Sequence, residues 1–264
     1  MTISAYIDGI GLLGPGLNGW PSAQSILLGQ QTYQPSKTVL PSPILLPTAE
    51  RRRSGAVIKL TLAAGLEAIA ASGQEAKKLA SVFSLSGGDG ENCHAICEML
   101  ASEDRAISPT RFHNSVHNAA AGYWGIATGA MTNASVLSAF DASFGAGLLE
   151  AMVQVVVDDT HTLLLACDTP YPEPLHSTRP ITDAFGIALV LAPKGSKHSF
   201  AHISVAMTDA CANTLNDSAL ENLRLGIPAA RGLPLLEAIA TRQNARVVLD
   251  YLDNCRLDVT ITPC

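Results

Sequence analysis

A short apolar segment that runs into small residues is the strongest candidate for chemistry in this sequence. Residues 134–143 read Ala-Ser-Val-Leu-Ser-Ala-Phe-Asp-Ala-Ser, which predicts a short strand followed by a helix N-terminus. Such a junction can hold a nucleophile, because the helix dipole stabilises an anion there. The residue at the junction is Asp141, not Cys or Ser. On these residues alone, the simpler interpretation of Asp141 is a helix cap.

A glycine-rich segment, Ser86 to Gly90, follows another predicted strand. Glycine loops can bind phosphate, but the lysine of such a loop is missing, so a tight turn is the better interpretation. The sequence also lacks a Gly-x-Ser-x-Gly elbow and a His-Glu-x-x-His pair. No cofactor is predicted.

The cysteines give a weak signal for metal binding. Of six, only Cys93 and Cys97 are closely spaced, and His94 is the one further candidate ligand nearby. We therefore expect buried, reduced thiols, because a free cysteine packs as a small hydrophobic residue. No metal site is predicted.

The elements that must position these residues alternate between strands and helices. Strands are predicted at residues 3–13, 79–85, 134–140, 162–167 and 185–192. Helices are predicted at 20–28, 54–72, 92–100, 118–128 and 141–157, with irregular segments at 30–47 and 108–117. After Pro193 the pattern weakens to strands at 200–207, 247–252 and 257–261 and a helix at 235–243. The alternation predicts an α/β fold with a layered α/β/α arrangement.

Composition excludes several classes of protein. The 264 residues are 47% hydrophobic and 15% charged, which excludes disorder for most of the chain. A net charge of -6 argues against nucleic-acid binding. No run of about 18 uninterrupted apolar residues occurs, so we expect no membrane span. The first residues lack the pattern of a signal peptide, which predicts a cytoplasmic protein.

Several segments together resemble the β-ketoacyl synthase family. The resemblance is carried by Ser108-Pro109, Asn118 to Tyr123, Gly129 and residues 138–143. These are similar to the family's Ser-Pro, Asn-x-x-Ala-Gly-His, Gly and Thr-Ala-Cys-x-Ser. Aligned without a gap from Gly122, the family's nucleophilic Cys falls on Asp141 and its following Ser on Ser143.

The resemblance covers about residues 3–192 and implies a thiolase-like fold. It implies that the N-terminal half of that fold is complete, at residues 1–195. The C-terminal half would be truncated to a remnant at residues 196–264.

Two departures from the family pattern imply that the condensation chemistry is lost. With Asp141 in place of Cys, no thioester can form. The family's catalytic histidines and lysine lie in its C-terminal half, and this chain has no His after His202 and no Lys after Lys197. The chain therefore resembles the family's non-catalytic chain length factors, which pair with an active synthase. It looks like the short version that accompanies aryl polyene synthases, and it would meet the acyl carrier protein through that complex.

The resemblance also implies which residues meet the partner. In the family the strand before the nucleophile pairs across the dimer axis, which assigns to the interface Ala134, Ser135, Val136, Leu137, Ser138, Ala139 and Phe140. A family loop that closes the partner's acyl pocket matches Arg111, Phe112, His113 and Ser115. Phe112 is the preferred pocket wall, because an aromatic ring is rigid.

Two other functions remain open on the residues. Asp141 could act as a general base with His113 or His117 in a stand-alone acyl thioester hydrolase or decarboxylase. The simpler interpretation gives neither histidine a catalytic role. Each would lie on the polar surface or be buried with its ring nitrogens hydrogen-bonded. The chain could also be a homodimeric acyl-chain binding module without a partner enzyme.

Overall fold

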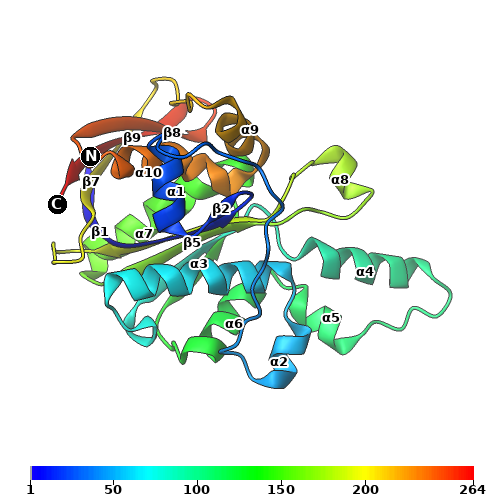
Figure 1. Cartoon of the computed structure of the whole chain (residues 1–264). Coiled ribbons are helices and arrows are strands. Elements are labelled where there is room, and N and C mark those ends of the chain that lie inside the picture. Colours follow the sequence, from blue (N-terminus) through cyan, green and yellow to red (C-terminus); the bar gives the residue numbers. More distant parts are fainter. Residues whose placement is uncertain (1) are drawn as a thin grey trace.

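One mixed β-sheet organises the chain in this computed structural model, which describes residues 2–264 (Figure 1). The strand order is β4-β3-β5-β6-β1-β7-β9-β8, and β2 pairs with β1. The strands are β1 Ile3–Gly14, β2 Leu17–Asn18, β3 Ala80–Ser84, β4 Ala134–Leu137, β5 Thr162–Asp168, β6 Phe185–Ala192, β7 Ala201–Thr208, β8 Ala245–Leu252 and β9 Cys255–Pro263. β3 pairs in parallel with β4 and β5, and the other pairings are antiparallel.

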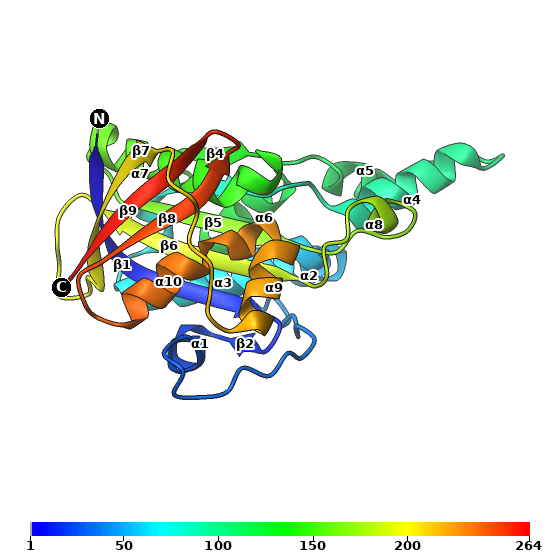
Figure 2. The same ribbon diagram turned by 90° about the horizontal axis from the view of Figure 1, so that it is seen from above.

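Helices cover both faces of this sheet. On one face lie α3 (Ala56–Ser72) and α6 (Ala119–Thr128), and on the other lie α1 (Trp20–Leu27), α7 (Ser143–Asp158) and α10 (Leu233–Ala240) (Figures 1 and 2). Each face has its own apolar core, and every residue of β5 and β6 is buried between them. Strands buried on both faces read as continuous apolar runs, which is why the sequence predicted them well. The layered α/β prediction is confirmed.

The remaining helices and three 3₁₀ turns complete the described chain. They are α2 Thr48–Arg53, α4 Gly90–Ala101, α5 Pro109–Asn114, α8 Leu175–Thr178 and α9 Ser218–Gly226, with 3₁₀ turns η1 Ala76–Lys78, η2 Phe140–Ala142 and η3 Pro228–Gly232. Helices α4 and α5 form an arm that projects from the body (Figure 1).

The small residues of α3 let this helix lie directly on β1. A Cβ atom at Gly9 would come within 2.1 Å of the carbonyl oxygen of Ala68, and one at Gly11 within 2.0 Å of that of Ala64. Glycine is required at both strand positions because the two backbones touch. This contact fixes the first strand of the chain against one helical layer.

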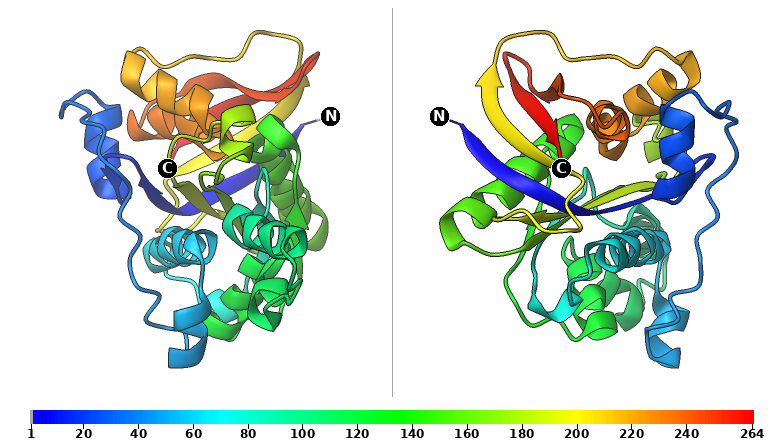
Figure 3. Two further views of the ribbon diagram at one scale, coloured as in Figure 1. Left: turned by 90° about the vertical axis from the view of Figure 1, so that its right-hand side faces the viewer. Right: turned by 60° about the vertical axis from the view of Figure 1, so that its left-hand side comes forward.

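The second segment of the chain continues the same sheet. β7 pairs with β1, and β9 and β8 follow it, so that these strands bend around α7 and α10 (Figure 3). The division at residues 195 and 196 falls in the turn between β6 and β7. Leu249 and Leu257 of the second segment share an apolar core with Phe144 of the first, so the two segments pack together. Descent of residues 196–264 from the family's C-terminal half stays a prediction.

One helical stretch, Phe140–Asp158, is long and apolar enough to cross a membrane by length and composition. Its mean hydropathy is 1.4, and 56% of it is buried inside the fold. Phe144, Leu148 and Met152 are fully buried in the core. A core helix passes the same test, so this stretch is weak evidence for a membrane span.

The structure differs from the local predictions at several points. The segment 108–117 contains α5, which begins where the Ser108 side chain accepts from the N–H of Arg111 and Pro109 stands at the first turn. Helix α9 was not predicted, although Asp217 caps it by accepting from the N–H groups of Ala219 and Leu220. The strand expected to reach Phe140 ends at Leu137.

Candidate functional site

The turn from β4 into α7 carries the candidate site, and its backbone is strained. Phe140 has a φ of 53°, which lies in the left-handed region that residues other than glycine rarely adopt. Ser143 holds this turn from inside, because its Oγ donates to the carbonyl of Phe140 at 2.7 Å and accepts from the N–H of Ala139 at 3.1 Å. Ser84 of β3 donates in turn to the carbonyl of Ser143 at 2.5 Å.

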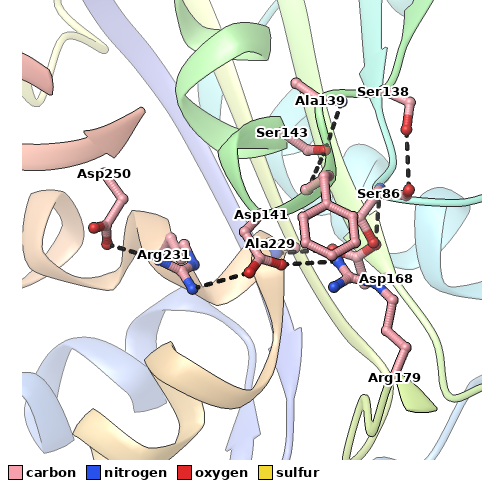
Figure 4. A network of polar contacts seen from close by, with 11 residues as sticks. Ser86, Ser138, Ala139, Asp141, Ser143, Asp168, Arg179, Ala229, Arg231 and Asp250 are labelled. Carbon is pink, nitrogen blue, oxygen red and sulfur yellow. Dashed lines mark hydrogen bonds and ion pairs between the residues drawn. The ribbon is translucent and has the colours of Figure 1, made fainter. Parts of the chain in front are cut away.

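Asp141 forms ion pairs and does not cap a helix. Neither η2 nor α7 has a side-chain cap, so the cap interpretation was wrong. Instead, Asp141 Oδ1 accepts from Arg179 Nη2 at 2.8 Å, and Oδ2 lies 3.5 Å from Arg231 Nη2 (Figure 4). The physical reason is that the loop after β5 and the 3₁₀ turn η3 bring two guanidinium groups to this carboxylate.

The ion pairs continue away from Asp141 as a chain of alternating charges. Arg231 Nη1 lies 3.3 Å from Asp250 Oδ2, and Asp250 also pairs with Arg224. Arg224 is 4% exposed and binds Glu221 through two contacts, Nε to Oε2 at 2.8 Å and Nη2 to Oε1 at 2.6 Å. These hydrogen bonds lower the pKa of Glu221 and raise that of Arg224. The full chain of charges is Arg179, Asp141, Arg231, Asp250, Arg224 and Glu221.

A second carboxylate, Asp168, lies buried at the end of β5 and ties three segments together. Its Oδ1 accepts from the N–H of Ser86 at 2.9 Å and from Ser86 Oγ at 2.6 Å, and its Oδ2 accepts from the N–H of Ala229 at 2.8 Å (Figure 4). Burial raises the pKa of Asp168 to about 6, although these three donors favour the charged form. Asp168 therefore positions η3, which carries Arg231.

This pKa predicts a pH-dependent stability. An unfolded Asp loses its proton near pH 4 and folded Asp168 near pH 6, so between these values the folded state binds more protons. Stability therefore falls as pH rises through this window, by about 3 kcal/mol for this group. Asp168→Asn should remove this component. Urea unfolding of both proteins at pH 4 and pH 7 measures it, and equal pH slopes would contradict the prediction.

The glycine-rich segment is a turn, as expected. A Cβ atom at Gly87 would come within 1.9 Å of the Tyr171 hydroxyl oxygen, so the ring packs on bare backbone. Asp89 then caps α4 by accepting from the N–H of Asn92 at 3.1 Å. The side chains of Ser86 and Asp89 are thus occupied in structural contacts.

The structure does not bring Asp141 together with the histidines proposed to act with it. Within residues 2–264, no hydrogen bond or ion pair links Asp141 to a His side chain. His113 is exposed on α5, and His117 is half-buried near Gly88. Both carboxylate oxygens of Asp141 face arginines, so the site supports ion pairing rather than proton transfer.

The residues expected to face a partner are exposed or half-buried in the chain. Arg111, Phe112 and His113 are exposed on α5, with 64% of Phe112 accessible, and Ser115 is half-buried with its Oγ bonded to the carbonyl of Phe112 at 2.9 Å. β4 is the end strand of the sheet, so one side of it is open. A role for either set in a complex stays a prediction.

The cysteines are less buried than expected. Cys167 is buried, but Cys93, Cys97, Cys211 and Cys264 are exposed and Cys255 is half-buried, so the burial prediction was wrong for these five. Cys93 and Cys97 are exposed because they lie on α4, which projects from the body of the protein. Within residues 2–264 no group of three or more His, Cys, Asp and Glu side chains is placed to hold a metal ion.

Sequence reasoning missed Arg179, Arg231 and Asp250 as parts of this site. Their side chains meet Asp141, or one another, across long sequence separations, 38 residues for Arg179 and Asp141. The sequence did offer one signal of a polar site nearby, which is Asp168, an acidic residue at the end of an apolar strand.

Comparison with known proteins gives a family and a fold. A family model described as Beta-ketoacyl synthase, N-terminal domain, matches residues 24–246. A search of curated proteins gives no match. The structure is similar to a chain of the ketosynthase ApeO in complex with its chain length factor ApeC from Xenorhabdus doucetiae, with a TM-score of 0.74, 21% identity, and coverage of 98% of this chain and 99% of that chain.

Two other known structures share this fold. The ishigamide ketosynthase/chain length factor has a TM-score of 0.72 at 12% identity, over 99% of both chains. The ketosynthase from module 1 of the bacillaene synthase of Bacillus amyloliquefaciens has a TM-score of 0.57 at 13% identity, over 81% of this chain and 47% of that chain. The chain is thus a thiolase-like half-domain that spans about half of such a full ketosynthase.

Proposed function

The chain belongs to the β-ketoacyl synthase N-terminal domain family, and from this membership we propose that it is a non-catalytic, chain length factor-like subunit. It would pair with an active ketosynthase that supplies the Cys and both His, and would meet the acyl carrier protein through that complex. The proposal depends mainly on the residue at the position of the nucleophile, which is Asp141 and not Cys. The family's nucleophile aligns with this residue, and both of its carboxylate oxygens face arginines.

Two further observations support a partnered role. Two similar structures that match over 99% of their own length, the ApeO–ApeC complex and the ishigamide ketosynthase/chain length factor, hold a ketosynthase with a chain length factor. The open edge of β4 and the exposed Phe112 are surfaces suited to a second subunit. In this proposal Arg111, Phe112, His113 and Ser115 close the partner's acyl pocket, and the product is an aryl polyene or a related acyl chain.

No observation favours the stand-alone hydrolase or decarboxylase. That reaction needs a free base beside its proton donor, whereas Asp141 pairs with Arg179 and Arg231 and with no histidine among residues 2–264.

The proposal is tested by assaying condensation with acyl- and malonyl-carrier protein. The purified chain should form no carbon-carbon bond, and Asp141→Cys should form none either, because the chain has no His after His202, where the family's catalytic histidines would lie. Co-expression with its partner ketosynthase, one that carries the Cys and both His, should give a 1:1 complex, by mass, that condenses. Condensation by the pure chain would contradict the proposal, as would thioester turnover that Asp141→Ala abolishes. A chain that stays a homodimer in the synthase's presence would instead favour the binding module.

A further inference from the structure

A hollow of about 620 Å³ lies beside the candidate site, between η2 and the β8–β9 hairpin. One wall is the strained turn, from Ala139 to Ala142, and the other is the hairpin tip, from Tyr251 to Cys255. Its two large exposed apolar side chains come from opposite walls, Phe140 at 62% exposed and Leu252 at 53%. Exposed apolar side chains gathered in one place are typical of a site that binds another molecule.

Phe140 is held at its backbone and at its ring. The carbonyl of Phe140 accepts from Ser143 Oγ, and the Arg179 guanidinium carbon lies 3.6 Å from the ring centre. A strained residue persists only where its surroundings fix it, and such residues cluster at functional sites. Aromatic residues and arginine are also enriched in protein–protein interfaces.

The position of β4 indicates what covers the hollow. β4 is an end strand, and only Ser138 and Ala139 separate it from Phe140. A strand that pairs with β4 advances about 3.3 Å per residue, so its continuation reaches the hollow within a few residues. On the rim, the exposed carboxylate of Asp253 makes no hydrogen bond or ion pair with any other residue of the described chain, 2–264. This free carboxylate favours a basic neighbour.

We propose that this hollow is a docking socket for the partner ketosynthase. It receives an apolar side chain from the segment that continues the strand paired with β4, and a basic residue of that segment faces Asp253. The inference rests on the proposed function, because it needs the ketosynthase as partner. It adds the β8–β9 hairpin, at the end of the chain, to the interface.

The test compares two leucines of equal exposure in the co-expressed complex. Leu252 lines the socket, whereas Leu225 lies on α9 outside it, and each is 53% exposed. Leu252→Ala should raise the Kd for the ketosynthase at least about tenfold, and Leu225→Ala should leave it within about twofold. Phe140→Ala should act like Leu252→Ala, and a lowered thermal midpoint would show whether it also disturbs the turn.

The outcomes separate this inference from the function on which it rests. If wild-type chain binds no ketosynthase, the proposed function fails. If wild type binds and Leu252→Ala leaves the Kd unchanged, the socket is wrong and the function stands. An unchanged Kd with a shifted product length would assign the hollow to the acyl chain, and this would also overturn the inference.

Discussion

Val136→Pro should abolish stable assembly with the partner ketosynthase. Leu85 and Ser81 donate to the carbonyls of Leu137 and Asn133, so odd-numbered residues of β4 face β3. The backbone of Val136 then faces the open edge, because successive residues of a strand alternate. Proline removes the outward N–H but no bond of the β3–β4 ladder. We expect the Kd to rise at least about a hundredfold, or roughly 2.7 kcal/mol.

Val136→Ala is the matched control. It trims the same side chain but keeps the N–H, so it should retain the 1:1 complex. Size-exclusion chromatography with light scattering distinguishes the two variants, and circular dichroism checks that Val136→Pro keeps the fold. A Val136→Pro chain that still forms the wild-type complex would show that β4 does not pair across the interface.

The fold was predictable where burial is uniform. β5 and β6 are buried along their whole lengths, and their apolar runs were visible without a partner strand. Helix α9 was missed because only Leu220, Leu223 and Arg224 of its residues are buried, which leaves a weak apolar stripe. Burial of Arg224 depends on carboxylates elsewhere, and periodicity gives no sign of it.

The candidate site was predictable only in its location. The strand-to-helix junction is local in sequence, and the segment around Asp141 was found from it. The partners of Asp141 are not local, since Arg179 arrives from the loop after β5 and Arg231 from the 3₁₀ turn η3, which follows β7 and α9. An aspartate at a helix start therefore read as a cap, because the tertiary contacts that outcompete capping leave no mark on its neighbours.

Arg224→Met should destabilise the chain by about 3 kcal/mol. Arg224 is buried between Glu221 and Asp250, and methionine fills similar space without the charge. Removing one partner of a buried ion pair typically costs about 3–5 kcal/mol, and we take the low end because both carboxylates keep some contact with water. The Arg231 contact at 3.3 Å still compensates Asp250, so Glu221 bears most of the loss. Urea unfolding of the purified chain, followed by circular dichroism, measures the change.

The pH dependence of that loss identifies its cause. Arg224 lowers the pKa of Glu221, so this contribution to stability is present above the ordinary pKa of a glutamate and disappears as pH falls through the lowered value. The difference between wild type and Arg224→Met should therefore shrink in acid. Adding Glu221→Gln to Arg224→Met should recover part of the stability, because it removes the charge left without its arginine while keeping an acceptor for the N–H of Leu215. A loss that stays constant with pH, with no recovery in the double variant, would mean that Arg224 stabilises α9 by packing alone and that the chain of charges behind Asp141 contributes little.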